Sequence, residues 1–568
     1  MRVWIGEGAS DEEASAIATA LAERYAERVE VYREELDEPI AVDEPPVSEP
    51  VADDLSPTDR EASLWEDIER VEAGGHEKYR ERLADQGKLF VRDRLDLWFG
   101  EDGLLFEDGR FAEWDADDRL PADGLLTGAA VFEDRRVHFM ANDYTVKAGS
   151  MAEKGVEKFL RMQQRALKTG RPVLYLMDSS GGRIDQQRGF FANREGIGKY
   201  YYNHSLLSGY VPQICVLYGP CIAGAAYTPV FADFTIMVEG MSAMAIASPR
   251  IVEMVTGEVI DLDTLGGPNV HARHSGSADL VATDEEHARA LVAELIRYLP
   301  DNANASLPVE APKPPERSPE GIDAVIPSEP NKGYDMWDVI ERVADRDSTL
   351  ELKSEFGKEV LTVLARLDGR PVGIIANQPA VRAGAIFPDS AQKAAEFIWT
   401  CDAYDIPLLY LCDTPGFMAG SQVEKDGILE AGKKMIYATS MATVPKQSVV
   451  VRKAYGAGIY AMSGPAYDPE GVIALPSGEI AIMGPEAAIN AVYKRKLDQI
   501  EDEEDRAQRE QELQEEYRRD IDVKRMASEV VIDEIVPPST LRDELCNRFE
   551  MYRNVTKQRP DKKHGTII

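Results

Sequence analysis

The chain has 568 residues, with 101 Asp and Glu against 64 Lys and Arg, so its formal net charge is −37 at pH 7. Hydrophobic residues make up 44% and charged residues 29%, a balance that excludes a disordered polymer, a collagen and a small disulfide scaffold. The length allows two to four domains with cores of their own. Because the chain is acidic, neither nucleic acid nor an anionic membrane is expected as a partner.

The five cysteines form no CxxC pair, which predicts reduced, mostly buried thiols and a cytoplasmic protein. No run approaches 18 apolar residues, and residues 1–14 lack the apolar core of a signal peptide, so no membrane span or secretion is expected. The acid excess is also typical of a halophilic protein adapted to a high-salt cytoplasm. An ordinary acidic protein is the alternative.

The pattern predicts several segments in chain order. Residues 1–38 are expected to form a small strand–helix–strand unit, to which no function is assigned, and residues 39–59 an acidic, Pro-rich linker. Charges alternate with apolar residues over 60–86, which predicts one amphipathic helix. A second Pro-rich linker over 307–333 separates domains at 60–306 and 334–560. The charged segment 493–519 is expected to be a solvated surface helix held by i,i+4 pairs.

An internal repeat connects the two halves. The segment PVLYLMDSSG at 172–181 aligns without a gap on PLLYLCDTPG at 407–416, an offset of 235. Downstream, GAAY at 224–227 aligns on AGIY at 457–460, an offset of 233. Several matches in one order, with small drifts in offset, predict a duplicated α/β domain.

Each copy carries the pattern of an anion-stabilising site. An apolar strand ends in Asp and a Gly-containing turn, and a second apolar strand leads into a Gly/Ala-rich loop that opens a helix. Such turns and helix starts present free backbone N–H groups, and two of them facing one point form an oxyanion hole. The alternative is that these glycines only turn the chain tightly or let a helix approach the sheet.

Other chemistries find less support. Neither a P-loop nor a GxGxxG opening a helix is present. His271 and His274 have the spacing of metal ligands, but no third ligand is evident, so a structural role and no bound metal are expected. Ser179 and Ser180 lack a partnering His, which argues against a serine hydrolase. The missing general base is therefore expected to come from outside the chain.

Six motifs together resemble the carboxyltransferase (beta) subunit of biotin-dependent acyl-CoA carboxylases, from about residue 60 to 554. They read ANDYTVKAGS, DSSGGRI, VPQICVLYGPCIAGAAY, LGGPNVHARHSG, DTPGFMAG and RKAYGAGIYAMSG. The resemblance implies two tandem crotonase-like (ββα superhelix) α/β domains with a small N-terminal extension. It also implies that 60–306 binds the acyl-CoA, that 334–560 binds carboxybiotin, and that a homohexamer builds its sites between subunits.

The resemblance also implies two oxyanion holes, one for the thioester enolate and one for the biotin ureido oxygen. The first is expected at Gly181, Gly182, Gly224 and Ala225, and the second at Gly416, Ala457 and Gly458. Residues expected to bind substrate are Ser180, Arg183, Ala223 and Tyr460. Candidates for anchoring CoA phosphates are Lys147, Arg183, Arg382 and Arg452, although each is also consistent with a structural cation. The chain has S-G-G-R where the family has G-G-A-R, so which amides point inward stays open.

The implied chemistry supplies the missing base. Carboxybiotin releases CO2, the biotin anion takes the α-proton of the thioester, and the enolate attacks the CO2. The chain has no biotinyl A-M-K-M site and no Gly-rich ATP-grasp loop. Biotin on a separate carrier protein or domain is therefore the expected cofactor, and the expected partners are a biotin carboxylase and a biotin carboxyl carrier.

Several activities remain open within this resemblance. A short-chain acyl-CoA, propionyl- or acetyl-CoA, is favoured as substrate. The alternatives are a methylcrotonyl-CoA-type carboxyltransferase and the α-subunit of a biotin-dependent acyl-CoA decarboxylase. Outside carboxyl transfer, a crotonase-type hydratase or isomerase and a catalytically silent assembly subunit are weighed. The duplication argues against the first of these, and the intact small residues in both loops argue against the second.

Overall fold

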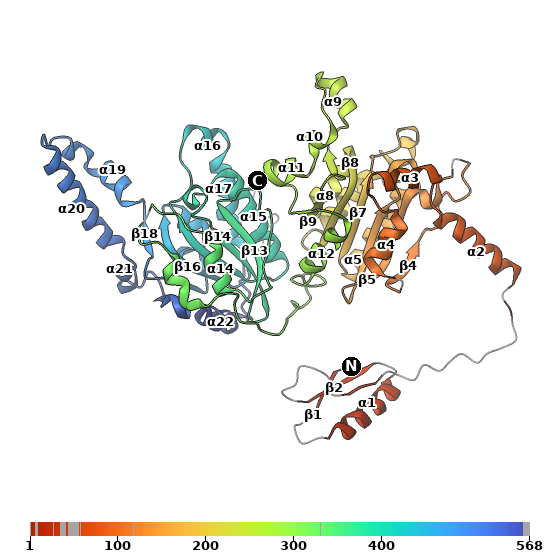
Figure 1. Cartoon of the computed structure of the whole chain (residues 1–568), viewed down its shortest axis with the longest axis horizontal. Helices are drawn as coiled ribbons and strands as arrows, with labels where there is room; N and C mark the ends of the chain where they lie inside the picture. The colour runs from red at the N-terminus through yellow and green to blue at the C-terminus, as the bar shows by residue number, and fades with distance from the viewer. Residues whose placement is uncertain are drawn as a thin grey trace. The chain divides into compact units, whose positions relative to one another are not determined.

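The computed structural model describes residues 2–5, 10–25, 28–33, 41–43, 56, 58–100, 102–117, 119–329 and 331–560. The chain forms two compact units, residues 1–67 and 68–568, which are treated separately below (Figure 1). Over these described ranges, every helix is too short or too polar to cross a membrane.

The first unit contains a three-stranded sheet and one helix. Strand β1 (Arg2–Ile5) pairs in parallel with β2 (Val29–Arg33), and β2 pairs antiparallel with β3 (Ala41–Asp43). The intervening helix α1 (Asp11–Tyr25) buries three alanines against the valines of β2, so its small side chains let it approach the sheet closely. The expected strand–helix–strand order is present, and β3 lies inside the range assigned to the linker. Most of the remaining linker lies outside the described residues.

The second unit contains two sheets of eight strands each. The N-terminal sheet consists of β4 (Leu104–Asp108), β5 (Leu125–Phe132), β6 (Arg135–Asn142), β7 (Val173–Ser179), β8 (Gln213–Ile222), β9 (Phe234–Val238), β10 (Ala243–Ala245) and β11 (Leu280–Ala282). The C-terminal sheet consists of β12 (Leu350–Glu351), β13 (Val360–Leu367), β14 (Arg370–Asn377), β15 (Leu408–Thr414), β16 (Lys446–Tyr455), β17 (Gly471–Ala474), β18 (Glu479–Ala481) and β19 (Glu534–Ile535).

The two sheets repeat one topology strand for strand. The first runs β4-β5-β6-β7-β8-β9-β11 with β10 beside β8, and the second runs β12-β13-β14-β15-β16-β17-β19 with β18 beside β16. In both, the first three strands are antiparallel and the later ones parallel. The parallel central strands are buried along their length, as their continuous apolar runs require. The predicted duplicated α/β domain is confirmed.

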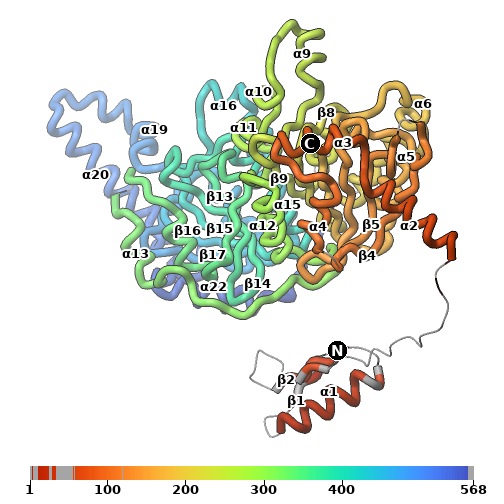
Figure 2. The backbone as a smooth tube through the Cα atoms, turned by 45° about the vertical axis from the view of Figure 1, so that its right-hand side comes forward, coloured from red at the N-terminus to blue at the C-terminus, as the bar shows by residue number. Residues whose placement is uncertain are grey.

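Helices cover these sheets and project from them (Figures 1 and 2). The longer ones are α4 (Val91–Phe99), α5 (Glu153–Thr169), α7 (Ile197–Leu207), α9 (Pro249–Thr256), α12 (Glu285–Ile296), α15 (Pro388–Ala403), α17 (Ile428–Met441) and α22 (Leu541–Tyr552).

Two of the expected helices are each broken into two. Residues 60–86 form α2 (Asp59–Glu72) and α3 (Glu77–Asp85), because Gly74 takes φ +70° and Gly75 lies directly against the carbonyl of Thr145. Residues 493–519 belong to α19 (Pro485–Leu497) and α20 (Glu503–Ile521). Here Asp502 caps the N-terminus of α20, and the two helices share a small core around Leu497 and Leu513.

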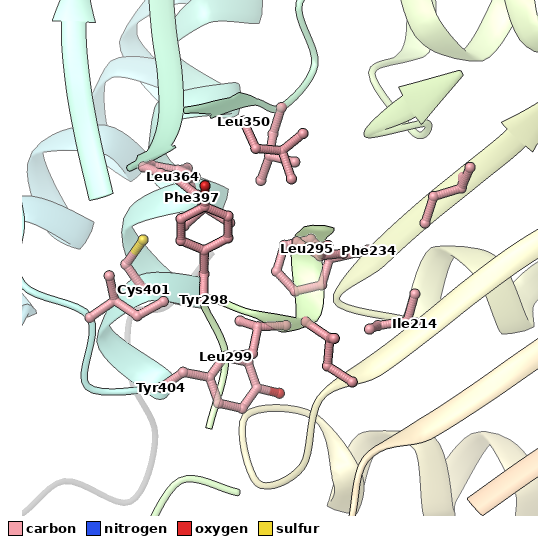
Figure 3. Close-up of a cluster of buried hydrophobic side chains, with 14 of the residues drawn as sticks. Ile214, Phe234, Leu295, Tyr298, Leu299, Leu350, Leu364, Phe397, Cys401 and Tyr404 are labelled. Carbon is pink, nitrogen blue, oxygen red and sulfur yellow. The ribbon is translucent and has the colours of Figure 1, made fainter. Parts of the chain in front are cut away.

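The two domains share one hydrophobic core. Figure 3 shows Phe234 and Leu295 of the N-terminal domain facing Leu350 and Phe397 of the C-terminal domain. At the same junction, the Tyr404 hydroxyl donates a 2.7 Å hydrogen bond to Asp233. The relative position of the two domains within one chain is therefore set by core packing, as in the interior of a single domain.

The segment 307–333, predicted as a linker, lies against the C-terminal domain. Arg542 on α22 donates to the Lys313 carbonyl at 2.9 Å, and Arg317 forms a 2.6 Å ion pair with Asp338. The Glu310 N–H also donates to the Gly369 carbonyl at 2.9 Å. This segment connects the domains while making fixed contacts of its own.

Candidate functional site

In the N-terminal domain, two turns meet where β7 and β8 end. Ser179 pairs with Cys221 across these parallel strands, so both strands end at the same edge of the sheet. Gly181 follows β7 with φ +102° and donates its N–H to the Ser179 hydroxyl at 3.3 Å. A Cβ on Gly181 would lie 3.1 Å from the Ile222 carbonyl oxygen. Glycine is therefore required by both backbone conformation and close approach.

The C-terminal domain builds the same junction from β15 and β16. Gly416 has φ +111° and donates its N–H to the Thr414 hydroxyl at 3.1 Å. A Cβ on Gly416 would lie 3.1 Å from the Tyr455 carbonyl oxygen. The facing turn leads through Ala457 into the short helix α18 (Gly458–Ala461). The repeat noted in the sequence therefore extends to individual hydrogen bonds.

One asparagine supports each junction from behind. Asn142 donates to the Gly149 carbonyl at 3.2 Å and accepts from the Asp178 N–H at 3.2 Å. The same two bonds recur at Asn377, at 3.3 and 3.1 Å. Each asparagine thus connects the Asp near the end of the strand to the adjacent loop, which fixes where the glycine turn begins.

Four backbone N–H groups at these junctions have no acceptor among the described residues; Gly182 and Ala457 are exposed, whereas Ala225 and Gly458 are buried. No described residue accepts a hydrogen bond of normal length and angle from the N–H of Gly182, Ala225, Ala457 or Gly458. The N–H groups of Gly181 and Gly416, in contrast, are held by the hydroxyls of the preceding strands. Two N–H groups from facing turns are the elements from which an oxyanion hole is built.

Arg183, expected to bind substrate, points into the protein instead. Its side chain is 4% exposed, forms an ion pair with Asp123, and donates to the Ser150 hydroxyl at 3.3 Å. The cause is a buried carboxylate 60 residues upstream, which a local motif does not reveal. Ser180 is exposed beside it, and its N–H donates to the Ala148 carbonyl at 3.1 Å.

The other three candidate cations differ in exposure. Arg452 is buried and donates to Asp413 at 2.9 Å, so it is a structural cation. Arg382 is 61% exposed and pairs with Glu359 at 2.9 Å. Lys147 is exposed at the equivalent position of the N-terminal domain. Only the latter two remain accessible to a substrate phosphate.

A buried carboxylate precedes each glycine turn; the Asp is evident in the sequence, but its pairing with a buried cation is not. Asp178 lies 3.2 Å from the Lys88 ammonium, and burial raises its pKa to about 6. Burial likewise raises the pKa of Asp413, against the opposing effect of Arg452. The sequence contains a signal for the carboxylate, because Asp stands one residue before the end of the strand in both copies of the repeat. Both carboxylates are enclosed, so they are placed to support the turns rather than to contact a substrate.

Each turn pair adjoins a cavity lined by its own domain. Beside Ala457 and Phe417 lies a cavity of about 660 Å³ with a mostly apolar lining that includes Ile436. Beside Ala226 and Tyr227 lies a cavity of about 180 Å³. Ala223 is exposed at the N-terminal junction, whereas Gly224 is half-buried. Tyr460 is 46% exposed on α18, and its ring stacks on Tyr467 at 5.6 Å.

His271 lines the smaller cavity and has a structural role, as expected from the sequence. Its two ring nitrogens lie 2.8 Å from the Ser275 hydroxyl and 2.8 Å from the Met244 carbonyl. In the part of the chain that the structure describes, His, Cys, Asp and Glu side chains form no group of three that could hold a metal ion.

Comparison with known proteins agrees with this geometry. The model of the carboxyl transferase domain family matches residues 82–567. An uncharacterized carboxylase of Bacillus subtilis, YngE, is 48% identical over 89% of this chain and 98% of its own. The carboxyltransferase subunit of propionyl-CoA carboxylase from Haloferax mediterranei is 37% identical over 90% of this chain and 99% of its own.

The fold also matches a solved structure, transcarboxylase 12S with methylmalonyl-CoA bound. The TM-score is 0.84 at 36% sequence identity, covering 90% of this chain and 99% of that one. Both the fold and the sequence therefore point to one family across nearly the whole of the second unit. The chain belongs to the carboxyl transferase family of biotin-dependent acyl-CoA carboxylases and decarboxylases.

Proposed function

We propose that the chain moves a carboxyl group from carboxybiotin to the α-carbon of a short-chain acyl-CoA, with propionyl- or acetyl-CoA preferred. One observation carries the proposal: two junctions with the same hydrogen bonds, each presenting two free N–H groups. At the N-terminal junction these groups come from two facing turns, and at the C-terminal junction from the single turn that opens α18. A reaction between two carbonyl compounds needs two such sites, one for the oxygen of each partner.

The two junctions have separate roles in this proposal. The N–H groups of Gly182 and Ala225 take the thioester oxygen as it becomes an enolate, while Ala457 and Gly458 take the ureido oxygen. Bound carboxybiotin supplies the carboxyl group and the base for the α-proton. The chain's own task is to hold both oxygens in place and to exclude water. The buried, paired state of Asp178 is consistent with a reaction that needs no side-chain base.

The residues beside Ala457 fit a biotin group. The cavity of about 660 Å³ has a mostly apolar lining with few polar side chains, which suits a fused bicyclic ring and its aliphatic chain. Phe417 and Ile436 would contact the ring system, and the free N–H groups at the rim would receive its polar edge.

The active assembly is proposed to be a homohexamer served by a biotin carboxylase and a biotin carboxyl carrier. The related transcarboxylase 12S assembles as a hexamer and forms a multienzyme core. The two cavities beside the junctions are each lined by residues of one domain, so a site containing both junctions is proposed to form between subunits. Helix α9 carries exposed apolar side chains, Met254 and Val255 each 73% exposed, which a second subunit would cover.

The choice of propionyl-CoA or acetyl-CoA rests on similarity. The Haloferax relative is named as a propionyl-CoA carboxylase subunit. The second candidate is the reverse direction, because the α-subunit of methylmalonyl-CoA decarboxylase from Propionigenium modestum is 36% identical over 88% of this chain. Both candidates use the same two junctions. They differ in direction: carboxylation starts from the acyl-CoA and carboxybiotin, and decarboxylation starts from the carboxylated acyl-CoA and biotin.

The test is a transfer assay with the purified full chain in high KCl. Free carboxybiotin is offered with acetyl-, propionyl- and 3-methylcrotonyl-CoA, and carboxylated products are measured by mass spectrometry. Product from acetyl- or propionyl-CoA is expected. Product only from 3-methylcrotonyl-CoA would keep carboxyl transfer and overturn the substrate. An intact oligomer that makes no product, and that also fails to decarboxylate methylmalonyl-CoA with free biotin, would overturn the proposed function.

A further inference from the structure

Two tyrosine hydroxyls converge on one backbone carbonyl at the N-terminal junction. Tyr200 and Tyr201 lie side by side on α7, and their hydroxyls donate to the Gly224 carbonyl at 2.5 and 2.9 Å. The same carbonyl accepts the N–H of Tyr227 within the turn. A carbonyl in a short helical turn ordinarily accepts one backbone N–H. The Gly224 carbonyl accepts two hydroxyls in addition.

The Gly224 carbonyl and the Ala225 N–H belong to the same planar peptide unit, where they point in opposite directions. Holding the oxygen therefore fixes the direction of the N–H. Donors on the oxygen also polarise the peptide, which makes its N–H a stronger donor. Among the described residues, none accepts a hydrogen bond of normal length and angle from the Ala225 N–H. It is also the proposed ligand of the thioester oxygen.

Both rings are fixed in position. Tyr200 is fully buried, and its ring lies 5.2 Å from that of Phe159. Tyr201 lies 5.5 Å from the ring of Tyr227 and stacks on Phe231 at 6.0 Å. Burial raises the pKa of both hydroxyls, so that of Tyr200 lies well above its ordinary value, and both stay protonated as donors. Gly224 has no side chain, and a Cβ there would lie 3.0 Å from the Tyr201 oxygen.

The C-terminal junction lacks this arrangement. The equivalent carbonyl, that of Ala457, accepts only the backbone N–H groups of Tyr460 and Ala461 among the described residues, at 3.2 and 3.1 Å. These are ordinary bonds of α18. The pair of tyrosine hydroxyls occurs at one junction and, among the described residues, not at the other, so we connect it with the difference in the reactions at the two junctions. In the proposed function, the N-terminal junction stabilises the enolate of the thioester, whereas the C-terminal junction binds the ureido oxygen.

We infer that Tyr200 and Tyr201 are positioning residues for enolate formation, acting through the Gly224–Ala225 peptide rather than by contact with the acyl-CoA. This inference rests on the proposed function and adds to it the part of the chain that tunes one oxyanion hole. It predicts that removing a hydroxyl weakens binding of the enolate-like transition state strongly and binding of the ground-state thioester only slightly.

The test compares Tyr200→Phe, Tyr201→Phe and the double variant with wild type in the full chain. The assay is biotin-dependent loss of the carboxyl group from methylmalonyl-CoA. Losing a direct oxyanion donor lowers turnover by roughly 10²–10³-fold. Because these hydroxyls act through a peptide, a fall of about 10-fold in kcat per hydroxyl is expected, with KM for the acyl-CoA changed less than about 2-fold. The matched control is Tyr175→Phe. Tyr175 is fully buried in the same aromatic cluster, but its hydroxyl donates to Gln213, and kcat should stay at the wild-type value.

A second readout is the infrared carbonyl frequency of bound propionyl-CoA. In wild type the thioester band is expected to shift to lower frequency on binding, and the shift should shrink in the phenylalanine variants. Wild-type kcat and an unchanged band in the double variant would overturn the inference while the proposed function stands. A fall in kcat matched by equal losses in Tyr175→Phe and in thermal stability would also overturn it. Wild-type protein that is inactive in every transfer assay would instead overturn the proposed function.

Discussion

One difference between the two junctions is the position of a methyl group. In the C-terminal domain, a Cβ on Gly458 would lie 2.8 Å from the Thr414 γ-methyl and 2.9 Å from the Gly416 Cα. In the N-terminal domain, the aligned residues are Ala225, which has that Cβ, and Ser179, which lacks the γ-methyl; both are fully buried. In both domains one methyl group fills the space between the facing turns. It belongs to the strand end in the C-terminal domain (Thr414) and to the facing turn in the N-terminal domain (Ala225). Tight packing of the turns was kept while individual residues changed.

The source of the buried cation differs as well. Asp413 is paired with Arg452 from the adjacent strand, whereas Asp178 is paired with Lys88 from the segment before α4. At the position aligned with Arg452 the N-terminal domain has Gly219, where a Cβ would collide with the Asp178 carboxylate. Two solutions to one buried charge allow a direct comparison, because arginine keeps its proton in proteins and lysine can lose it.

The largest expected effect is on stability. Asp413→Asn leaves Arg452 buried and charged without its partner, which costs about 3–5 kcal/mol. Asp178→Asn should cost less, because a lysine, unlike an arginine, can be accommodated in its neutral form at a buried site. Denaturant unfolding of both variants at pH 7 measures the difference. Equal losses would contradict the comparison.

The pH dependence of the same pair gives a second check on sign. Asp178 has a folded pKa of about 6, above the unfolded value of about 3.9. Between these values the folded chain holds a proton that the unfolded chain releases, so stability is lost as pH rises through this window. Wild type should therefore gain stability relative to Asp178→Asn when pH falls from about 7 to about 4.5. A pH-independent difference would show that the carboxyl does not titrate in this window.

The next effect is on activity. Gly458→Pro removes one proposed oxyanion donor, and turnover should fall roughly 10²–10³-fold, equivalent to about 3–4 kcal/mol. The control is Thr414→Ser combined with Gly458→Ala, which adds a side chain but keeps the N–H and reproduces the N-terminal pair. Wild-type turnover in a correctly assembled Gly458→Pro protein would remove Gly458 from the site.

A smaller effect on stability is expected when the methyl group is moved from position 414 to position 458. Gly458→Ala alone overpacks the junction, at a cost of about 1–3 kcal/mol. Adding Thr414→Ser should recover about 1 kcal/mol or more of this loss, because the two residues are in contact. A double-mutant cycle by thermal unfolding measures the coupling. Additive losses would mean that the two sites relax independently.

The smallest expected effect concerns surface charge, which both domains share. With a net charge of −37, self-repulsion should be screened by salt, and the melting temperature should rise between low and molar KCl. A melting temperature that is flat in KCl would favour an ordinary acidic protein.

What the sequence predicted correctly follows from the duplication. Because the repeat contained both strand ends and both glycine turns, it located the turns at Gly181 and Gly416 and their facing loops. It did not show that the N–H groups of these two glycines are held by Ser179 and Thr414. The missed features depend on contacts distant in sequence. Arg183 turns inward toward Asp123, and the break between α2 and α3 depends on Thr145. The Tyr200–Tyr201 contact with Gly224 joins a helix to a turn 24 residues away, and periodicity carries no information about it.

The most direct test of the proposed site is subunit complementation. Gly182→Pro removes a donor on the acyl-CoA side and Gly458→Pro one on the biotin side, so each variant alone should be nearly inactive. If sites form between subunits, half of the randomly mixed pairs contain both variants, and each mixed pair holds one site with both junctions intact. Mixed assemblies should then recover about a quarter of wild-type transfer activity. Verified mixed assemblies that remain inactive would contradict a site that joins one junction from each subunit.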